Sequence, residues 1–120
     1  MQDEPHDQRA LLPDEAQGRE NVVVLYLVQA MLGLLSPTVL AVAAEVRRDG
    51  LIVHFALEQL GDAERDDVED ILADLDALLE NEKDLPTAWK IEPSLHVGSP
   101  DATWPGRPHR RVYESKAARA

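Results

Sequence analysis

The chain has no cysteine among its 120 residues, which excludes a disulfide framework, a thiolate zinc site and a cysteine nucleophile. The absence of cysteine also fits a reducing compartment. Aromatic residues make up only 4% of the chain, so we expect a mainly aliphatic core. The apolar fraction of 44% is ordinary for a globular protein, and the length predicts one small domain with a single core.

Basic residues are scarce. Lysine and arginine number 12, against 23 aspartate and glutamate residues, which leaves a net charge of −11. Because binding to phosphates needs clustered lysine and arginine, this composition argues against nucleic acid and against anionic membrane surfaces as direct partners. A basic protein is the partner class that the charge favours.

A membrane-spanning segment is also missing from the sequence. The longest apolar run, residues 22–35, has 14 residues and contains Gln29 and Gly33, whereas a span needs roughly 20. The first 20 residues are polar and acidic and lack the basic and apolar regions of a signal peptide. We therefore expect a buried helix at residues 22–35 and a cytoplasmic location.

The negative charge is concentrated in residues 62–82. This segment holds ten carboxylates and one cation, Arg65, so it carries −9 of the total −11. Apolar residues recur there at helical spacing and predict one narrow buried stripe: Val68, Ile71, Leu72, Leu75, Leu78 and Leu79. At 100° per residue Asp66, Glu69 and Asp70 point away from that stripe, and Asp74 lies along its flank. We expect Asp62 to cap this helix and its end to fall at residues 81–84.

An Asp49-Gly50 pair separates two apolar runs, residues 38–48 and 51–60, and predicts a β-hairpin with a two-residue turn. In that register Val46 faces Val53 and Val42 faces Leu57. The predicted apolar face is formed by Val42, Ala44, Val46, Val53, Phe55 and Leu57. The other face carries Ala41, Ala43, Glu45, Arg47, Ile52, His54, Ala56 and Glu58.

The remaining elements complete an αββαββ order. A first helix is expected at residues 19–35, ended by Ser36-Pro37, and strands at residues 89–97 and 109–115. Pro93 lacks a donor, so the third strand is expected at a sheet edge or with a bulge. The prediction is an α+β fold with a mainly antiparallel four-stranded sheet packed against two helices. Residues 1–18 are interpreted as a flexible leader, 19–116 as one domain and 117–120 as a tail.

No residue pattern for catalysis, cofactor binding or metal binding is recognisable. The four histidines, His6, His54, His96 and His109, have no helical ligand spacing, and His54 is expected to form a surface pair with Glu45 across the hairpin. The acids of residues 62–82 are expected on a solvent-facing helix, which does not suit acid/base catalysis. We therefore predict no catalytic residue, cofactor or metal.

Two further features lie near the C-terminus. Trp104 stands in a loop rich in proline and glycine and is either folded back onto the protein or exposed as an anchor for a partner. The basic cluster Arg107, His109, Arg110 and Arg111 either protects an edge strand from aggregation or neutralises part of the acidic helix.

Several motifs occur together in one order: LGxxSP at residues 32–37, LIVHFALE after Gly50, DDVEDILADL at residues 66–75, and RRVYE at residues 110–114. Over residues 20–116 this pattern resembles small bacterial immunity proteins of polymorphic toxins, in particular the immunity partners of MafB-type toxins. The resemblance implies a non-enzymatic protein that neutralises a cognate toxin domain, commonly a nuclease, by direct contact.

The charge pattern and the resemblance together predict a partner-binding surface formed by Asp66, Glu69, Asp70, Asp74 and Trp104. An acidic surface would bind a basic nuclease domain rapidly through electrostatic steering. One alternative is a small homodimeric structural or interaction protein, in which the apolar first helix forms the dimer contact and the acidic helix is merely solvated. A second alternative is an enzyme without a recognisable motif.

Overall fold

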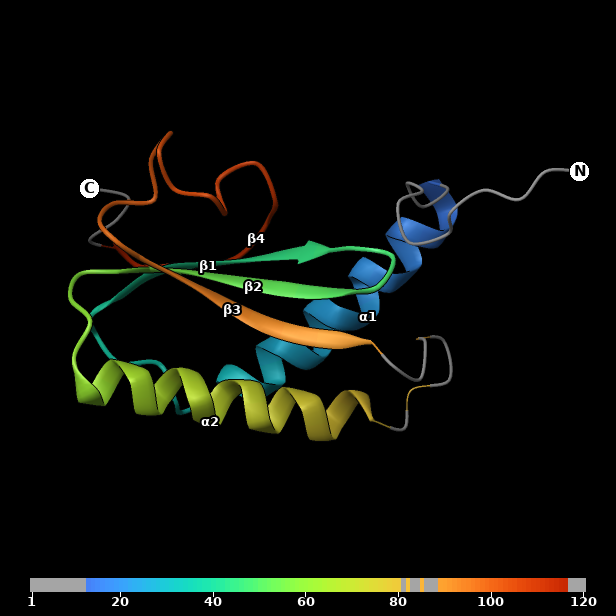
Figure 1. Cartoon of the computed structure of the whole chain (residues 1–120), viewed down its shortest axis with the longest axis horizontal. Coiled ribbons are helices and arrows are strands. Elements are labelled where there is room, and N and C mark those ends of the chain that lie inside the picture. The colour runs from blue at the N-terminus through green and yellow to red at the C-terminus, as the bar shows by residue number, and fades with distance from the viewer. Residues whose placement is uncertain (1–12, 81, 83–84, 86–88, 117–120) are drawn as a thin grey trace, which may run out of the picture.

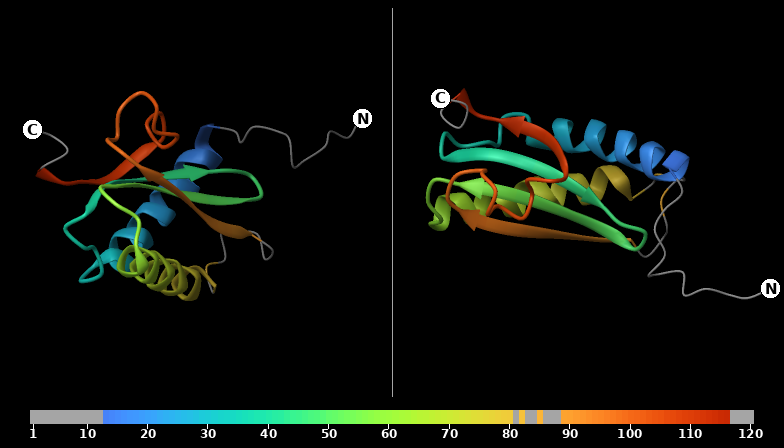
Figure 2. Two further views of the ribbon diagram at one scale, coloured as in Figure 1. Left: turned by 60° about the vertical axis from the view of Figure 1, so that its left-hand side comes forward. Right: turned by 90° about the horizontal axis from the view of Figure 1, so that it is seen from above.

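The computed structural model describes residues 13–80, 82, 85 and 89–116. The elements along the chain are α1 (Pro13–Met31), β1 (Val39–Val46), β2 (Gly50–Leu57), α2 (Asp62–Leu79), β3 (Lys90–Val97) and β4 (Arg110–Glu114). Both helices cover one face of the sheet, and the loop between β3 and β4 lies on the other face (Figures 1 and 2). The predicted α+β fold and its αββαββ order are confirmed.

The four strands form one mixed sheet in the order β3-β2-β1-β4. Strand β1 is antiparallel to β2 and β4, whereas β3 is parallel to β2. The parallel pair arises because α2 carries the chain back across the sheet before β3 begins. Pro93 therefore lies on an edge strand, as its missing donor predicted.

The hairpin register differs from the predicted one by two residues. Val46 pairs with Leu51 and Val42 with Phe55, and the N–H of Arg47 donates to the carbonyl of Gly50 at 2.8 Å. Positive φ angles in the described part of the chain occur at glycines 33 and 98 alone, so the turn is not the Asp-Gly type expected.

Gly50 is required for a different reason. A Cβ atom at this position would lie 2.5 Å from the carbonyl oxygen of Lys90, at the start of the neighbouring parallel strand. The glycine allows the backbones of β2 and β3 to approach, which is the second common use of glycine in a strand. The Asp49-Gly50 pair therefore predicted the hairpin at the correct place, but the reason given for the glycine, a turn with positive φ angles, was wrong.

The two predicted faces of the hairpin are confirmed, because a shift of two residues keeps each side chain on its own side. On the helix-covered face, Val42, Val53 and Phe55 are completely buried. They belong to a core completed mainly by the helices; its other buried members are Val23, Leu27, Ala30, Met31, Val39, Ala44, Leu51, Leu57, Val68, Ile71, Leu75 and Leu79.

A smaller apolar cluster lies on the opposite face of the sheet. Leu40, Ala41, Ala43 and Ala56 are covered there by the indole of Trp104. The sheet is therefore buried on both faces near β1, which explains why six successive residues of this strand, from Val39 to Ala44, are buried.

Both helices differ from the prediction at their ends. Helix α1 begins at Pro13, a residue favoured in the first turn of a helix, so residues 13–18 of the predicted leader are helical. It ends at Met31 rather than at residue 35, since the chain turns at residues 32–34 around Gly33, a poor helix former. Residues 1–12 and 117–120, the rest of the predicted leader and the tail, lie outside the described residues.

Helix α2 is capped by Gly61, not by Asp62, and ends at Leu79. The backbone N–H of Gly61 donates to Oε1 of Glu64 at 2.8 Å, so a side chain of the first turn satisfies the cap. The other oxygen of Glu64 accepts hydrogen bonds from Thr38 and Gln59. Within the described residues no helix is both long and apolar enough to cross a membrane.

Candidate functional site

The predicted acidic residues of α2 lie on its outer surface. Asp66, Glu69, Asp70 and Asp74 are all exposed, because the buried stripe from Val68 to Leu79 faces the sheet and α1. The ion pairs of the described residues use Glu20, Glu45 and Glu114 as their acids, so within that set no carboxylate of α2 is neutralised by a cation. We call these four residues the acidic face.

The outer side of α1 exposes hydrophobic side chains among polar ones, which include Asn21 and Gln29. Leu25 is 66% exposed and Val28 is 42% exposed, and Leu32, directly after the helix, is 72% exposed. The helix was expected to be buried or, in the alternative, to form a dimer contact, and no helix or strand of the described residues covers this side. Burial of the opposite side, through Val23 and Leu27, is complete.

Asp74 of the acidic face lies beside α1. A shallow hollow of about 320 Å³ lies between the two helices and is lined by Gln29, Ala30, Asp74, Ala77 and Leu78. One carboxylate of the acidic face therefore borders the groove between the helices. The layer of two helices thus exposes both carboxylates and hydrophobic side chains, and protein-binding surfaces combine the two kinds of contact.

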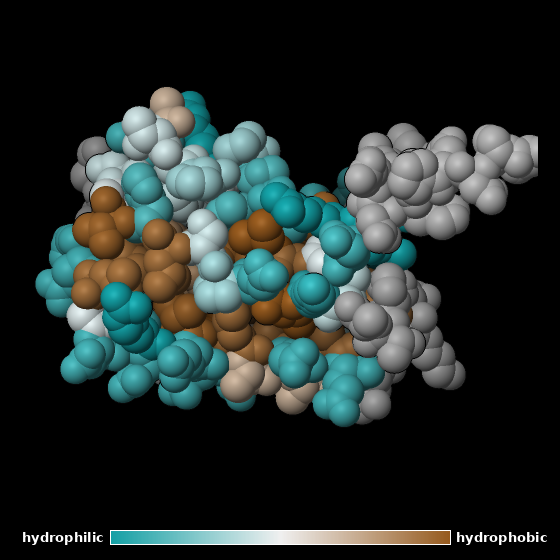
Figure 3. Space-filling model, viewed as in Figure 1, coloured by the Kyte–Doolittle hydropathy of each residue, from teal (hydrophilic) through white to brown (hydrophobic). Residues whose placement is uncertain are grey.

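A second apolar area follows β3 and the adjacent flank of α2 (Figure 3). Partly buried side chains of these two elements, Ile91, Leu95 and Leu72, pack against the buried core. Val97, at the end of the strand, is 55% exposed. This area is therefore the open edge of the core beside an edge strand.

Trp104 does not join the acidic face. It is 1% exposed and packs on the sheet face opposite α2, with the guanidinium carbon of Arg111 5.0 Å from its ring centre. This placement corresponds to the indole folded back onto the protein, so Trp104 presents no surface to a partner. Its role is to hold the loop between β3 and β4 on the sheet.

The basic cluster lies at the β4 edge of the sheet and not against α2. Arg110 pairs with Glu20 of α1 at 3.0 Å, and Arg111 pairs with Glu114 at 3.1 Å. Because β4 is an edge strand, the placement agrees with charge protecting an edge. It does not support the alternative that this cluster neutralises the acidic helix.

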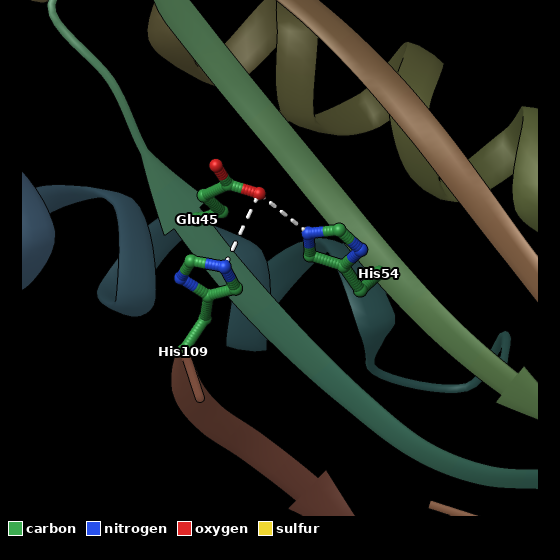
Figure 4. Close-up of side chains that lie close together, drawn as sticks. All are labelled: Glu45, His54 and His109. Carbon is green, nitrogen blue, oxygen red and sulfur yellow. Dashed lines mark hydrogen bonds and ion pairs between the residues drawn. The ribbon is translucent and has the colours of Figure 1, made fainter. Parts of the chain in front are cut away.

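The structure adds a third polar residue, His109, to the predicted pair of His54 and Glu45. The Nε2 atoms of His54 and His109 lie 2.8 Å and 3.3 Å from the same oxygen, Oε1 of Glu45 (Figure 4). The two imidazole rings are parallel, with their centres 5.3 Å apart. The other Glu45 oxygen, Oε2, accepts a 2.8 Å hydrogen bond from Nε of Arg47.

The contact between His54 and Glu45 was predicted, but its character is different. His54 is 4% exposed and pairs across the sheet with Ala43, so Glu45 reaches it diagonally. Its second ring nitrogen, Nδ1, is buried without a hydrogen-bond partner among the described residues. The expected surface pair is thus a largely buried one.

Glu45 is held in its ionised form. Burial acts to raise its pKa, but hydrogen bonds from His54 and Arg47, together with the charge of His109, outweigh burial and lower the pKa below its ordinary value. Strand alternation could have placed Glu45 beside His54. His109 was beyond such reasoning, because its position depends on β4 pairing with β1 from the far end of the chain.

A scan against protein-family models gives no match for this chain, and neither does a search of curated proteins.

Proposed function

We propose that this chain is a non-catalytic immunity-type protein that neutralises a cognate toxin domain by direct contact. The partner we infer is basic and of the nuclease type, and the acidic face on α2 is the surface that meets it. The observation that carries this proposal is the exposure of Asp66, Glu69, Asp70 and Asp74 without an ion-pair partner among the described side chains. The sequence resemblance to toxin immunity proteins points to the same function.

The physical basis is charge complementarity. A nuclease domain carries a positive surface because its substrate is a polyanion, so a dense acidic helix attracts the domain and occupies the surface that the nucleic acid would use. Steering of this kind increases the association rate more than it increases the affinity. The acidic face therefore supplies speed and orientation.

Affinity needs apolar contacts as well, because exposed ion pairs are individually weak. Leu25 on α1 and Leu32 directly after it are exposed, and Gln29 and Ala30 of the same helix line the hollow together with Asp74. Side chains of this kind become binding anchors when a partner removes them from water. We infer that the contact surface extends from the acidic face onto α1.

The test begins with recovery of the partner. The untagged chain would serve as bait in a pull-down from its native host, and would be co-expressed with the C-terminal domain of any secreted protein found to be encoded by a neighbouring gene; a stable complex would identify the partner. Stopped-flow association would then compare D66K/E69K and D70K/D74K with a control, E58K/E92K. All three double variants change the net charge equally, and the control residues are exposed but lie outside α2, Glu58 in the loop after β2 and Glu92 on β3.

Both acidic-face variants are expected to slow association at low salt by about tenfold or more and to flatten its salt dependence. The control is expected to change the rate much less. Equal effects of all three variants would show that net charge, and not this face, attracts the partner. An unchanged rate in the two acidic-face variants would place the contact surface elsewhere.

A homodimer is the second candidate function, and the exposure of Leu25, Val28 and Leu32 specifically favours it. Two copies could bury these side chains against each other. Light scattering after size exclusion would reveal a dimer whose mass falls to that of one chain in L25E/L32E. If the unaltered protein has the mass of a single chain at all concentrations, the homodimer is wrong. The exposed side chains are then available to contact the partner of the first proposal.

A further inference from the structure

We propose that Glu45, His54 and His109 form a binding site for one divalent transition-metal ion of the zinc class. The site lies on the sheet face opposite the helices, under the loop between β3 and β4, so it is separate from the acidic face. It departs from the sequence-based expectation of no metal. The proposal does not depend on the immunity function.

The donor atoms already converge. The two imidazole Nε2 atoms and one carboxylate oxygen all lie within 4.8 Å of one another. In a tetrahedral zinc site with Zn–N distances of about 2.0–2.1 Å, neighbouring donor atoms are about 3.3 Å apart. The observed separations from Glu45 Oε1, 2.8 Å to His54 and 3.3 Å to His109, are close to that spacing. A small withdrawal of the carboxylate makes room for an ion.

The donor set selects the class of metal. Two imidazoles and one carboxylate suit zinc and its first-row neighbours, whereas calcium and magnesium prefer oxygen ligands throughout. Three protein ligands leave a fourth position for water. The side chain of His109 is 31% exposed, so this ligand gives the site access to solvent, while His54 closes its inner end.

The surroundings hold the ligands in place. Arg47 binds Oε2 of Glu45 and leaves Oε1 directed at the imidazoles, which is the arrangement of a metal-binding carboxylate oriented by a second hydrogen bond. Gly106 packs on His54 so closely that a Cβ there would lie 2.6 Å from the Cβ of His54. Backbone hydrogen bonds from Arg107 to Trp104 and from His109 to Gly106 fix the loop that delivers the third ligand.

The proposal is tested with the untagged full-length chain and zinc chloride in isothermal titration calorimetry. We expect one ion per chain. His109→Ala should weaken binding at least about tenfold, because it removes one of three ligands. The matched control is His96→Ala, since His96 is a partly buried histidine of β3 outside the cluster. The zinc affinity of this variant should stay within about twofold of that of the unaltered protein.

A second measurement does not rely on any variant. In ¹⁵N spectra of histidine side chains, zinc should shift the Nε2 resonances of two histidines, and loss of one of them in His109→Ala assigns it. Circular dichroism verifies that this variant is folded. If it fails to fold, the spectra of the unaltered chain decide the question alone.

Three results would overturn the proposal. The first is no saturable zinc binding, which would leave the cluster as a hydrogen-bonded structural group. The second is equal loss of affinity in His96→Ala and His109→Ala. The third is zinc binding that leaves all imidazole resonances unshifted and therefore uses carboxylates elsewhere.

Discussion

Thr38 donates a 2.8 Å hydrogen bond from its hydroxyl to Oε2 of Glu64, and this contact joins the residue before β1 to the first turn of α2. Glu64 is buried, yet its carboxylate is well supplied with donors. The hydroxyl of Thr38 and the backbone N–H of Gly61 lower the pKa of Glu64 below its ordinary value of 4.5.

This arrangement predicts a loss of stability in acid. Because the folded pKa of Glu64 is lowered, its stabilising effect is complete above pH 4.5 and disappears as the pH falls through the folded value. Urea unfolding measures the free energy of unfolding from pH 7 to pH 3. This free energy should decrease less in Glu64→Gln than in the unaltered chain. Glu69→Gln removes the same charge from an exposed position and should leave the decrease unchanged; equal curves for both variants would contradict the assignment.

Gly50→Ala should destabilise the protein by about 1–3 kcal/mol, since the new methyl group would lie 2.5 Å from the backbone oxygen of Lys90. Strand β3 begins at this contact, so its pairing with β2 should loosen first. Gly18→Ala is the matched control. Outside its own helical turn, no heavy atom of the described residues lies within 4 Å of a Cβ at Gly18, which is inside α1, and alanine there should stabilise by about 0.5–1 kcal/mol. Chemical denaturation measures both changes, and a neutral Gly50→Ala would contradict the close approach.

Leu75→Ala should lower the free energy of unfolding by about 2–5 kcal/mol, because the side chain is completely buried between α2 and the core. Leu25→Ala removes the same atoms from a residue that is 66% exposed, and its effect should stay within about 0.5 kcal/mol. A large effect at Leu25 under conditions where the chain is monomeric would indicate that α1 packs differently from the structure.

The buried position of Trp104 can be read by fluorescence. In Trp89→Phe, Trp104 is the one remaining tryptophan. Its emission should be blue-shifted and poorly quenched by acrylamide, since the ring is shielded by the sheet and by Arg111. Trp104→Ala should cost about 3–5 kcal/mol by emptying that space. Efficient quenching would instead support the exposed anchor that the loop sequence also allowed.

Local patterns predicted much of this fold. The helical spacing from Val68 to Leu79 identified the buried side of α2 and, with it, the exposure of Asp66 and Asp70. Strict alternation identified both faces of the hairpin even though the turn chemistry of Asp49-Gly50 was misjudged. These signals work because each depends on residues close together in the sequence.

The parts that sequence reasoning missed depend on distant pairing. Glycine is needed at position 50 because the backbone of Lys90 lies against it on the neighbouring strand, and no local sequence rule relates the two residues. Likewise His109 meets Glu45 because β4 lies beside β1, although the chain between them contains β2, α2 and β3. The acidic face was therefore predictable, whereas of the cluster on the opposite sheet face only the contact between Glu45 and His54 was.

The place of β4 at the edge of the sheet has a kinetic consequence. Its pairing with β1 closes the largest chain loop in the sheet, and a strand of this kind is expected to dock late in folding and to detach early in partial unfolding. Glu45 and His54 share the local β1–β2 hairpin and stay together when β4 detaches. His109 leaves with the strand, so the three-residue cluster exists only once the C-terminal strand has docked.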